Sequence, residues 1–141
     1  MGDRRQSREA ALQALFFLDV NQTDTNQGLD DFCAEHEDML TAGVKPFFLE
    51  LVDGVMTHKT EIDRLLDKSA RNWKVSRMPA VDRNIMRIAV FEMLKRDDIP
   101  ASVSINEAVE IGKKFGTRDS GSFINGVLDR IRSVENMGGA L

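Results

Sequence analysis

Hydrophobic side chains crowd the stretch over residues 79–96. Over ten consecutive positions in its second half, only Arg87 and Glu92 are polar. A surface helix carries a single apolar stripe, so a helix that is apolar nearly all round must be covered on several sides. Pro79 suits the start of a helix, and Pro100 prevents simple continuation beyond its end. The pattern therefore predicts a central core helix over residues 79–96.

Helical spacing of apolar residues predicts three further helices before the central one. The first begins within residues 4–7 and ends near residue 20. The second covers residues 29–40, and a long third helix covers residues 46–68 with a bend near Gly54. Polar turn-forming residues separate the first two helices. No stretch alternates with the period of a β-strand, so an all-α fold is expected.

Two more helices are predicted after the central one. Ser104 and Glu107 have the spacing of a capping box, which predicts a helix over residues 104–116. Gly116 is placed to end that helix. A last helix follows, with a polar cap at residues 119–120, and the final six residues of the chain are expected to be disordered.

A basic connector, residues 69–78, precedes the central helix and holds the only tryptophan, Trp73. We expect Trp73 to be an anchor packed on the core, and a solvent-facing ring that stacks on nucleic-acid bases is the sharper alternative. Cys33, on an apolar helical face, is expected to be inert core. His36 and His58 are far apart in sequence, and no Cys or His spacing suggests a metal site.

The composition is that of a single globular domain, with 141 residues, 42% hydrophobic and 30% charged. The one cysteine and the lack of a membrane span or signal peptide favour the cytoplasm. No phosphate-binding loop, dinucleotide turn or nucleophile elbow is present, so enzyme activity and a cofactor are not expected. These features indicate a helical binding module.

Charge is distributed unevenly along the chain, whose formal net charge is −4. Residues 19–67 hold three bases and twelve acids, and residues 68–96 hold eight bases and two acids. The acidic half and the basic band can be a mixed solvated surface or separate binding surfaces for partners of opposite charge.

Three arginines lie at the start of the first predicted helix, namely Arg4, Arg5 and Arg8. Cations at a helix N-terminus oppose the helix dipole, which favours anions there. Such a local conflict indicates either a solubilising arm or a functional role that overrides stability.

Three segments in order carry a family resemblance, which runs from about residue 4 to residue 130: RRQSREAALQALF, RNWKVSRMPAVDRNIMRIAVFEML and INEAVEIGKKFGTRDSGSFINGVLD. With these segments the chain resembles the NusB family of bacterial transcription antitermination factors. The family implies an all-α fold of about seven helices in two small perpendicular bundles packed together. Here the N-terminal bundle would cover residues 1–77 and the C-terminal bundle residues 78–141.

The resemblance also implies partners. NusB proteins bind the boxA sequence of nascent ribosomal RNA transcripts together with NusE, a protein also found in the small ribosomal subunit. The complex joins other Nus factors on RNA polymerase and suppresses premature termination. No metal, cofactor or membrane contact is implied.

Site residues follow from the family motifs, residue by residue. Those carried over for RNA binding are Arg4, Arg5, Arg8, Phe16, Asp119 and Phe123, the last two also being candidates for the NusE surface. Asp82, an acid early in the central helix, is the candidate contact for NusE. The arginine run is interrupted, and Phe16 lacks the hydroxyl of the tyrosine found in some relatives. Helical phase leaves Phe123 open between surface and core.

Two rivals accompany this interpretation. One is a NusB-like domain attached to an RNA cytosine methyltransferase. The chain length argues against this alternative, because 141 residues leave no room for a catalytic domain. The other is a plain helical adaptor or homodimer with no RNA role.

Overall fold

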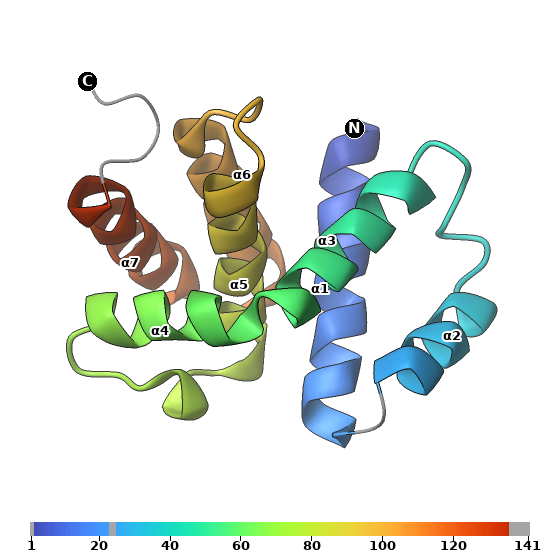
Figure 1. Cartoon of the computed structure of the whole chain (residues 1–141), viewed down its shortest axis with the longest axis horizontal. Helices are drawn as coiled ribbons and strands as arrows, with labels where there is room; N and C mark the ends of the chain where they lie inside the picture. Colours follow the sequence, from blue (N-terminus) through green and yellow to red (C-terminus); the bar gives the residue numbers. More distant parts are fainter. Residues whose placement is uncertain (1, 23–24, 136–141) are drawn as a thin grey trace.

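The computed structural model describes residues 2–22 and 25–135, which leaves the C-terminal tail expected to be disordered outside the described residues. Helices account for most of this part, and it contains no strand, which confirms the all-α prediction (Figure 1). The elements are α1 (Asp3–Asn21), α2 (Thr25–Glu35), α3 (Lys45–Thr57), α4 (Lys59–Ser69), the 3-10 turn η1 (Val75–Arg77), α5 (Ala80–Lys95), α6 (Ala101–Phe115) and α7 (Ser120–Val134). No helix in the described ranges has the length and apolar character needed to cross a membrane.

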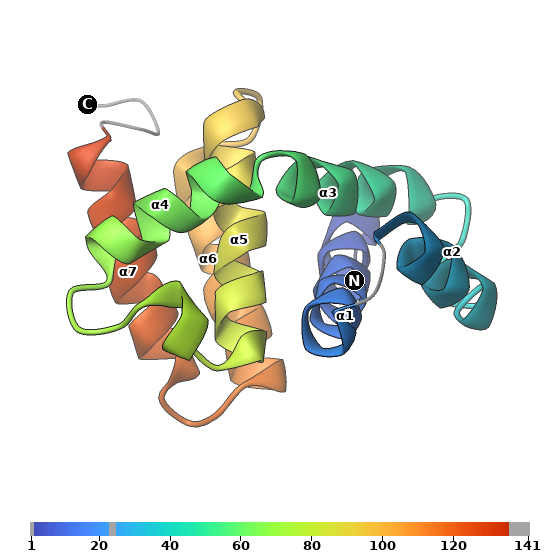
Figure 2. The same cartoon turned by 60° about the horizontal axis from the view of Figure 1, so that its bottom comes forward.

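The helices form two groups that meet along α1 and α5. Helices α1, α2 and α3 pack together, and α4, α6 and α7 pack around α5. Figure 2 shows α3 and α4 following one another across both groups, with only His58 between them. Since α4 packs against α5 and α7, its contacts place it with the later helices, although it precedes residue 77. The division at residue 77 stays a prediction.

Helix α5 is the centre of the molecule, as its hydrophobic pattern predicts. It contacts α1, α3, α4, α6 and α7, and its residues from Asn84 to Met93 are all buried. At the crossing with α3, the Phe91 ring lies against Gly54, where an added Cβ would come within 2.2 Å of the ring. The lack of a side chain at Gly54 therefore lets α5 pack closely against α3. The bend expected near Gly54 occurs instead as a break between helices at His58.

Two helix boundaries differ from the predictions. Helix α2 covers residues 25–35 and not 29–40, and hydrogen-bonded turns lead from its end to Leu40. Helix α6 begins three residues earlier than predicted because Pro100, with φ fixed at −58°, occupies its N-cap. Ser104 is thus inside the helix, where its hydroxyl bonds to Glu92, and the predicted capping box is absent.

Gly116 ends α6 as predicted, for a steric reason and not a conformational one. Its φ of −96° lies outside the left-handed region. A Cβ at this position would approach the Ser120 Oγ to 2.3 Å. The glycine leaves room for the hydroxyl that bonds the Thr117 backbone amide at the start of the next helix.

Candidate nucleic-acid interface

The three N-terminal arginines have different surroundings. Arg4 is exposed, and its guanidinium carbon lies 4.5 Å from the centre of the Phe47 ring. Arg5 forms a two-pronged hydrogen bond with Glu107 on α6. Only Arg4 of the three has no carboxylate within 4 Å among the residues that the structure describes. It is therefore the arginine of this group best placed to meet a phosphate.

Arg8 is buried, with 5% of its surface exposed. Its Nε and Nη2 donate to the two carboxylate oxygens of Glu92 on α5, both at 2.8 Å. The Ser104 hydroxyl donates to the same carboxylate at 2.7 Å. The Arg8 guanidinium is enclosed between α1, α5 and α6 and engaged there, which disfavours its predicted contact with RNA.

Phe16 lies on the surface with 39% exposure, near the end of α1. With Phe17, Phe32 and Phe115 it lines an apolar hollow of about 340 Å³ between α1, α2 and α6. The position is accessible to a ligand, as its predicted role requires. It offers an apolar ring and no hydrogen-bonding group.

Asp82 is buried, with 5% exposure, which contradicts its predicted role as an exposed contact for NusE. Its Oδ1 accepts a hydrogen bond from the Ser120 Oγ at 2.8 Å, and that hydroxyl accepts one from the Thr117 backbone amide at 2.9 Å. Burial raises the pKa of Asp82, and the bond from Ser120 offsets part of this rise. The carboxylate thus fixes the turn between α6 and α7 from inside the molecule.

The first turn of α7 carries the remaining two predicted residues. Asp119 is the N-cap residue and is exposed, and its side chain makes no capping hydrogen bond. Phe123 is half-buried and lies edge-on to Trp73, with ring centres 6.4 Å apart and planes at 70°. Since Trp73 is 48% exposed, its prediction as an anchor packed on the core is wrong. The ring faces solvent, and its stacking on nucleic-acid bases stays a prediction. Phe123 lies at the boundary between core and surface.

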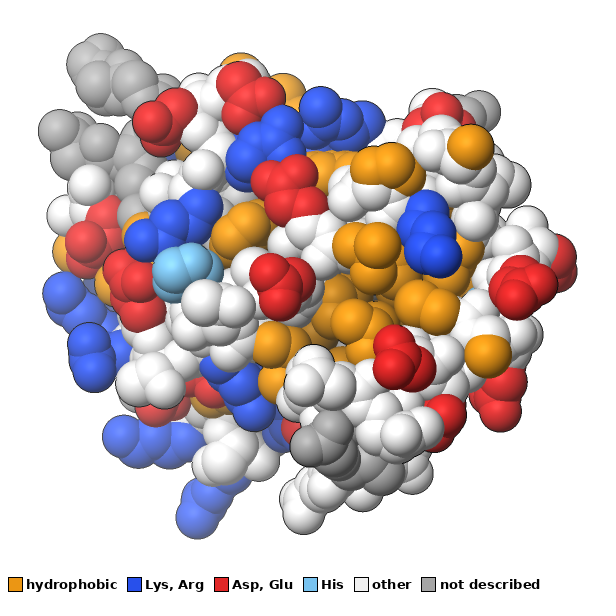
Figure 3. Space-filling view, turned by 45° about the vertical axis from the view of Figure 1, so that its right-hand side comes forward, with side chains coloured by type: hydrophobic (Ala, Val, Ile, Leu, Met, Phe, Trp, Pro, Cys, Tyr) orange, Lys and Arg blue, Asp and Glu red, His pale blue; other side chains and the backbone are white. Residues whose placement is uncertain are grey.

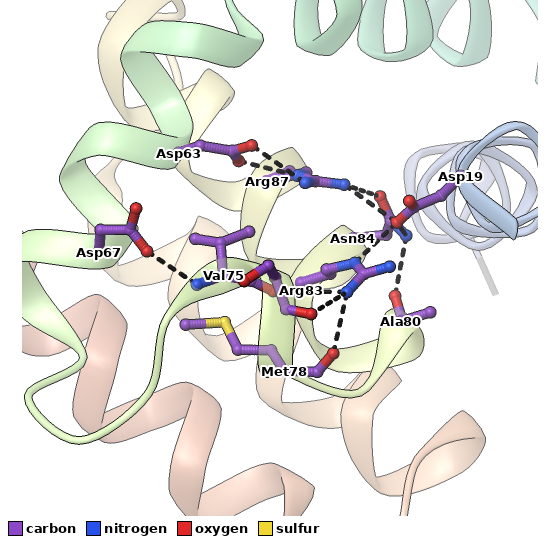
Figure 4. A network of polar contacts seen from close by, with 10 residues as sticks. Asp19, Asp63, Asp67, Val75, Met78, Ala80, Arg83, Asn84 and Arg87 are labelled. Atoms are coloured by element: carbon purple, nitrogen blue, oxygen red, sulfur yellow. Dashed lines mark hydrogen bonds and ion pairs between the residues drawn. The ribbon is translucent and has the colours of Figure 1, made fainter. Parts of the chain in front are cut away.

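Much of the basic band is neutralised inside the fold. Arg87 bonds to Asp63 through two nitrogens and approaches Asp19 at 3.2 Å (Figure 4). Arg83 donates to Asp19 at 2.7 Å and to backbone carbonyls that include that of Met78. Burial raises the pKa of Asp19, but the hydrogen bonds from Arg83 and Asn84 and the charge of Arg87 outweigh it, and the pKa is lowered overall. These arginines tie the end of α1 to α5.

Three cations of the connector remain available: Arg71, Lys74 and Arg77. All three are exposed, and none has a carboxylate within 4 Å in the described part of the chain. They surround the exposed Trp73 in sequence. The basic composition of the connector is the signal that points to them, whereas Arg83 and Arg87 of the basic band, on α5, form ion pairs within the fold.

The predicted residues thus gather in two separate places. Arg4 and Arg5 lie where α5 ends and α6 begins, whereas Asp119 and Phe123 lie at the other end of α5, beside the connector (Figure 1). Within the described ranges, no group of three His, Cys, Asp or Glu side chains is arranged to hold a metal ion. Exposed cations occur at both places, and at the connector they lie beside the exposed Trp73 ring, an arrangement that suits binding.

Comparison with known proteins decides the family. The NusB family profile matches residues 5–133. The chain is 61% identical over 137 residues to the transcription antitermination protein NusB of Desulforapulum autotrophicum, covering 97% of this chain and 96% of the relative. The chain belongs to the NusB family.

Solved NusB structures share the fold. Thermotoga maritima NusB is 35% identical, with a TM-score of 0.80 over 92% of this chain and 90% of that one. A crystal structure of antitermination factors NusB and NusE in complex with double-stranded RNA has a TM-score of 0.83 over 94% of this chain and 97% of the chain compared. At 23% identity this second likeness shows the fold alone.

Proposed function

We propose that this protein is a transcription antitermination factor that binds boxA RNA of nascent ribosomal RNA transcripts together with NusE. The observation that carries the proposal is the 61% identity, over nearly the whole chain, to a transcription antitermination protein NusB. In this proposal the protein acts in the cytoplasm with other Nus factors on RNA polymerase and is not an enzyme. It works by holding RNA and protein together.

Two surfaces support RNA binding. One is at the start of α1, where the exposed Arg4 guanidinium lies over the buried Phe47 ring of α3. The other combines the cations of residues 71–77 with the exposed ring of Trp73 and the half-buried ring of Phe123. Exposed cations supply a salt-dependent grip on phosphates, and exposed rings suit the unstacked bases of single-stranded RNA.

The acidic half of the chain supports binding of NusE, a basic ribosomal protein. Asp30, Asp31 and Glu35 are exposed on α2. Figure 3 shows hydrophobic side chains gathered in a hollow on the face that includes α2 and α3, with acidic and basic side chains around it. An apolar area next to the acids of α2 suits a basic protein partner, and the charges should mainly raise the association rate.

The test is the affinity for boxA RNA and for a scrambled RNA over a salt series, with and without NusE. Replacing Arg71, Lys74 and Arg77 with alanine should weaken both RNAs and flatten the log–log salt dependence by about 0.7 for each lost phosphate contact. Alanine at Lys45, Lys59 and Arg64, on α3 and α4, makes the same change in charge and is the matched control. Arg8 is left intact because its removal would leave the buried Glu92 carboxylate without an opposite charge.

RNA binding that stays undetectable with NusE present would refute the proposal. The adaptor or homodimer interpretation would then be tested by sedimentation of the chain alone. A triple variant that keeps the parent affinity and salt slope would move the phosphate contacts away from the connector, with Arg4 as the next variant to measure.

A further inference from the structure

The apolar hollow beside Phe16 takes its walls from both bundles, because α1, α2, α5 and α6 all contribute to it. Its volume is about 340 Å³. Small-molecule sites usually have volumes of about 300–1,000 Å³ and often lie between packed helices. The lining includes four phenylalanines and two uncharged polar residues, namely Phe16, Phe17, Phe32, Phe115, Gln13 and His36. The hollow therefore has the size and the lining of a ligand site.

Stacked rings hold the hollow in shape. Phe32 is 3% exposed, and its ring stacks on that of Phe48 in α3, with ring centres 6.0 Å apart. The His36 imidazole stacks on the same Phe32 ring, with centres 4.0 Å apart and planes at 19°. Phe16 and Phe115 are both exposed and leave the hollow open to solvent. A preformed site loses little conformational entropy when a flat ligand enters it.

A hydrogen bond fixes which nitrogen of His36 can meet a ligand. Nδ1 lies 2.8 Å from the backbone carbonyl oxygen of Phe32, and since a carbonyl oxygen only accepts, Nδ1 carries the hydrogen. Nε2 is then an acceptor in the neutral ring. Among the described residues no side-chain nitrogen is both buried and without a hydrogen-bond partner, so Nε2, which has none there, is accessible.

The polar groups of the hollow call for a neutral ligand with a donor. The Gln13 amide nitrogen lies 3.9 Å from the Met39 sulfur, which leaves the amide oxygen as a second acceptor. No described Lys, Arg, Asp or Glu lines the hollow, although 30% of the chain is charged. The Lys114 ammonium, 5.3 Å from the centre of the Phe115 ring, is paired with Glu9 at 3.0 Å. A charged ligand would lose its hydration here without gaining a partner.

We propose that this hollow binds a small, neutral aromatic molecule that carries an N–H or O–H group. The flat ring packs among the phenylalanine rings, and its N–H or O–H donates to Nε2 of His36. An RNA segment suits the hollow poorly, because every nucleotide brings a phosphate and the lining offers no cation. The site goes beyond the proposed function and does not depend on it.

Indole is the probe, because it is flat and neutral and has a single N–H. N-methylindole, which lacks that hydrogen, is the matched control ligand. The isotope-labelled full chain is titrated with each at about pH 8, where histidine rings are normally neutral. Proton–nitrogen correlation spectra report the ring nitrogens of both histidines, and His58, outside the hollow, is the internal reference. We expect indole to shift the Nε2 resonance of His36 and to leave that of His58 in place.

Affinities test the hydrogen bond. Indole should bind with a Kd of about 0.1–1 mM, as is usual for so small a ligand. N-methylindole should bind about 2- to 12-fold more weakly, the effect of one lost hydrogen bond. His36→Phe keeps a flat ring beside Phe32 and should abolish the preference for indole over N-methylindole. Calorimetry measures these affinities.

A second variant tests the position of the ligand. Phe16→Ala removes one wall of the hollow at an exposed position, so the fold should persist, and indole should bind about tenfold more weakly. Trp73→Ala also removes an exposed ring but lies outside the hollow, and it should leave the affinity unchanged. Circular dichroism confirms that both variants are folded.

Four results would overturn the site. The first is no shift of the His36 resonance by millimolar indole, and the second is equal affinity for indole and N-methylindole. The third is unchanged indole binding in Phe16→Ala, which would place the ligand elsewhere. The fourth is displacement of bound indole by NusE or by boxA RNA, which would assign the hollow to that macromolecule. None of these results bears on whether the protein binds RNA.

Discussion

Arg8 carries a full charge into a region that water does not reach, and two residues make that position tolerable. Glu92 supplies the opposite charge in a two-pronged geometry, and Ser104 satisfies the same carboxylate from a third helix. Removing each of the two ions from water costs several kcal/mol. Good ion-pair geometry and additional hydrogen bonds are needed to offset this cost. The pair therefore depends on both partners being present.

At the residue scale we predict that Glu92→Ala destabilises the fold by about 3–5 kcal/mol, because Arg8 would remain as an uncompensated buried charge. The double variant Arg8→Met with Glu92→Leu should lose much less, since both charges are removed together. Urea unfolding followed by circular dichroism measures both. Equal losses in the single and double variants would show that the pair is not coupled.

Site residues were partly predictable from sequence. Exposed Arg4, Asp119 and the boundary position of Phe123 agree with what the family motifs require. The burial of Arg8 and Asp82 was not predicted, because it depends on packing against helices that are distant in the sequence. A local sequence pattern carries no information about those contacts. Trp73 was misplaced because its large apolar ring favours the core unless the surrounding surface is known.

The strength of the local sequence signal explains where the predicted helices succeed. Helices α1 and α5 match their predicted spans closely because their apolar periodicity is strong, and Pro79 also marks the start of α5. The single long helix over residues 46–68 is two helices, since a break of one residue at His58 leaves the apolar spacing almost unchanged. Periodicity identifies a buried face but does not reveal a break that preserves it.

Helix α6 is fastened to α1 by an ion pair that should make stability sensitive to acid. The hydrogen bond from Arg5, with the nearby charges of Arg5 and Arg8, lowers the pKa of Glu107 despite its partial burial. A carboxylate whose pKa is lowered on folding stabilises the fold at neutral pH. That contribution is lost as pH falls from the ordinary value of 4.5 through the lowered one.

We therefore predict that Glu107→Gln is less stable than the parent at pH 7 and that the difference shrinks as the pH falls below 4.5. Urea unfolding at a series of pH values measures the difference. Glu110→Gln, on the same helix, changes an exposed residue paired only within α6 and serves as control. A gap between Glu107→Gln and the parent that stays constant into acid would contradict the assigned linkage.

The whole molecule is two bundles fastened at both ends of α1. Arg5 and Arg8 connect the start of the helix to α6 and α5, and Asp19 connects its end to α5. The crossing of Phe91 over Gly54 adds an apolar contact between α3 and α5. With polar ties at both ends and close packing between them, neither bundle should unfold independently of the other.

Two built-in probes test this cooperativity. Trp73 reports on the bundle around α5, and Cys33, the only cysteine, reports on α2 in the other bundle. We predict that Trp73 emission and the reactivity of the Cys33 thiol change at the same urea concentration, as a two-state transition requires. Separate midpoints would show that the two bundles unfold in sequence.

The pairing of Arg8 with Glu92 also has a consequence in time. The arginine is made among the first residues of the chain, and its partner follows 84 residues later. At a synthesis rate of about 5–20 residues per second, Glu92 is added to the growing chain about 4–17 s after Arg8. During that interval α1 can form on the ribosome, but it has to keep Arg8 in water. The N-terminal bundle therefore cannot bury Arg8 until the central helix α5 has been synthesised.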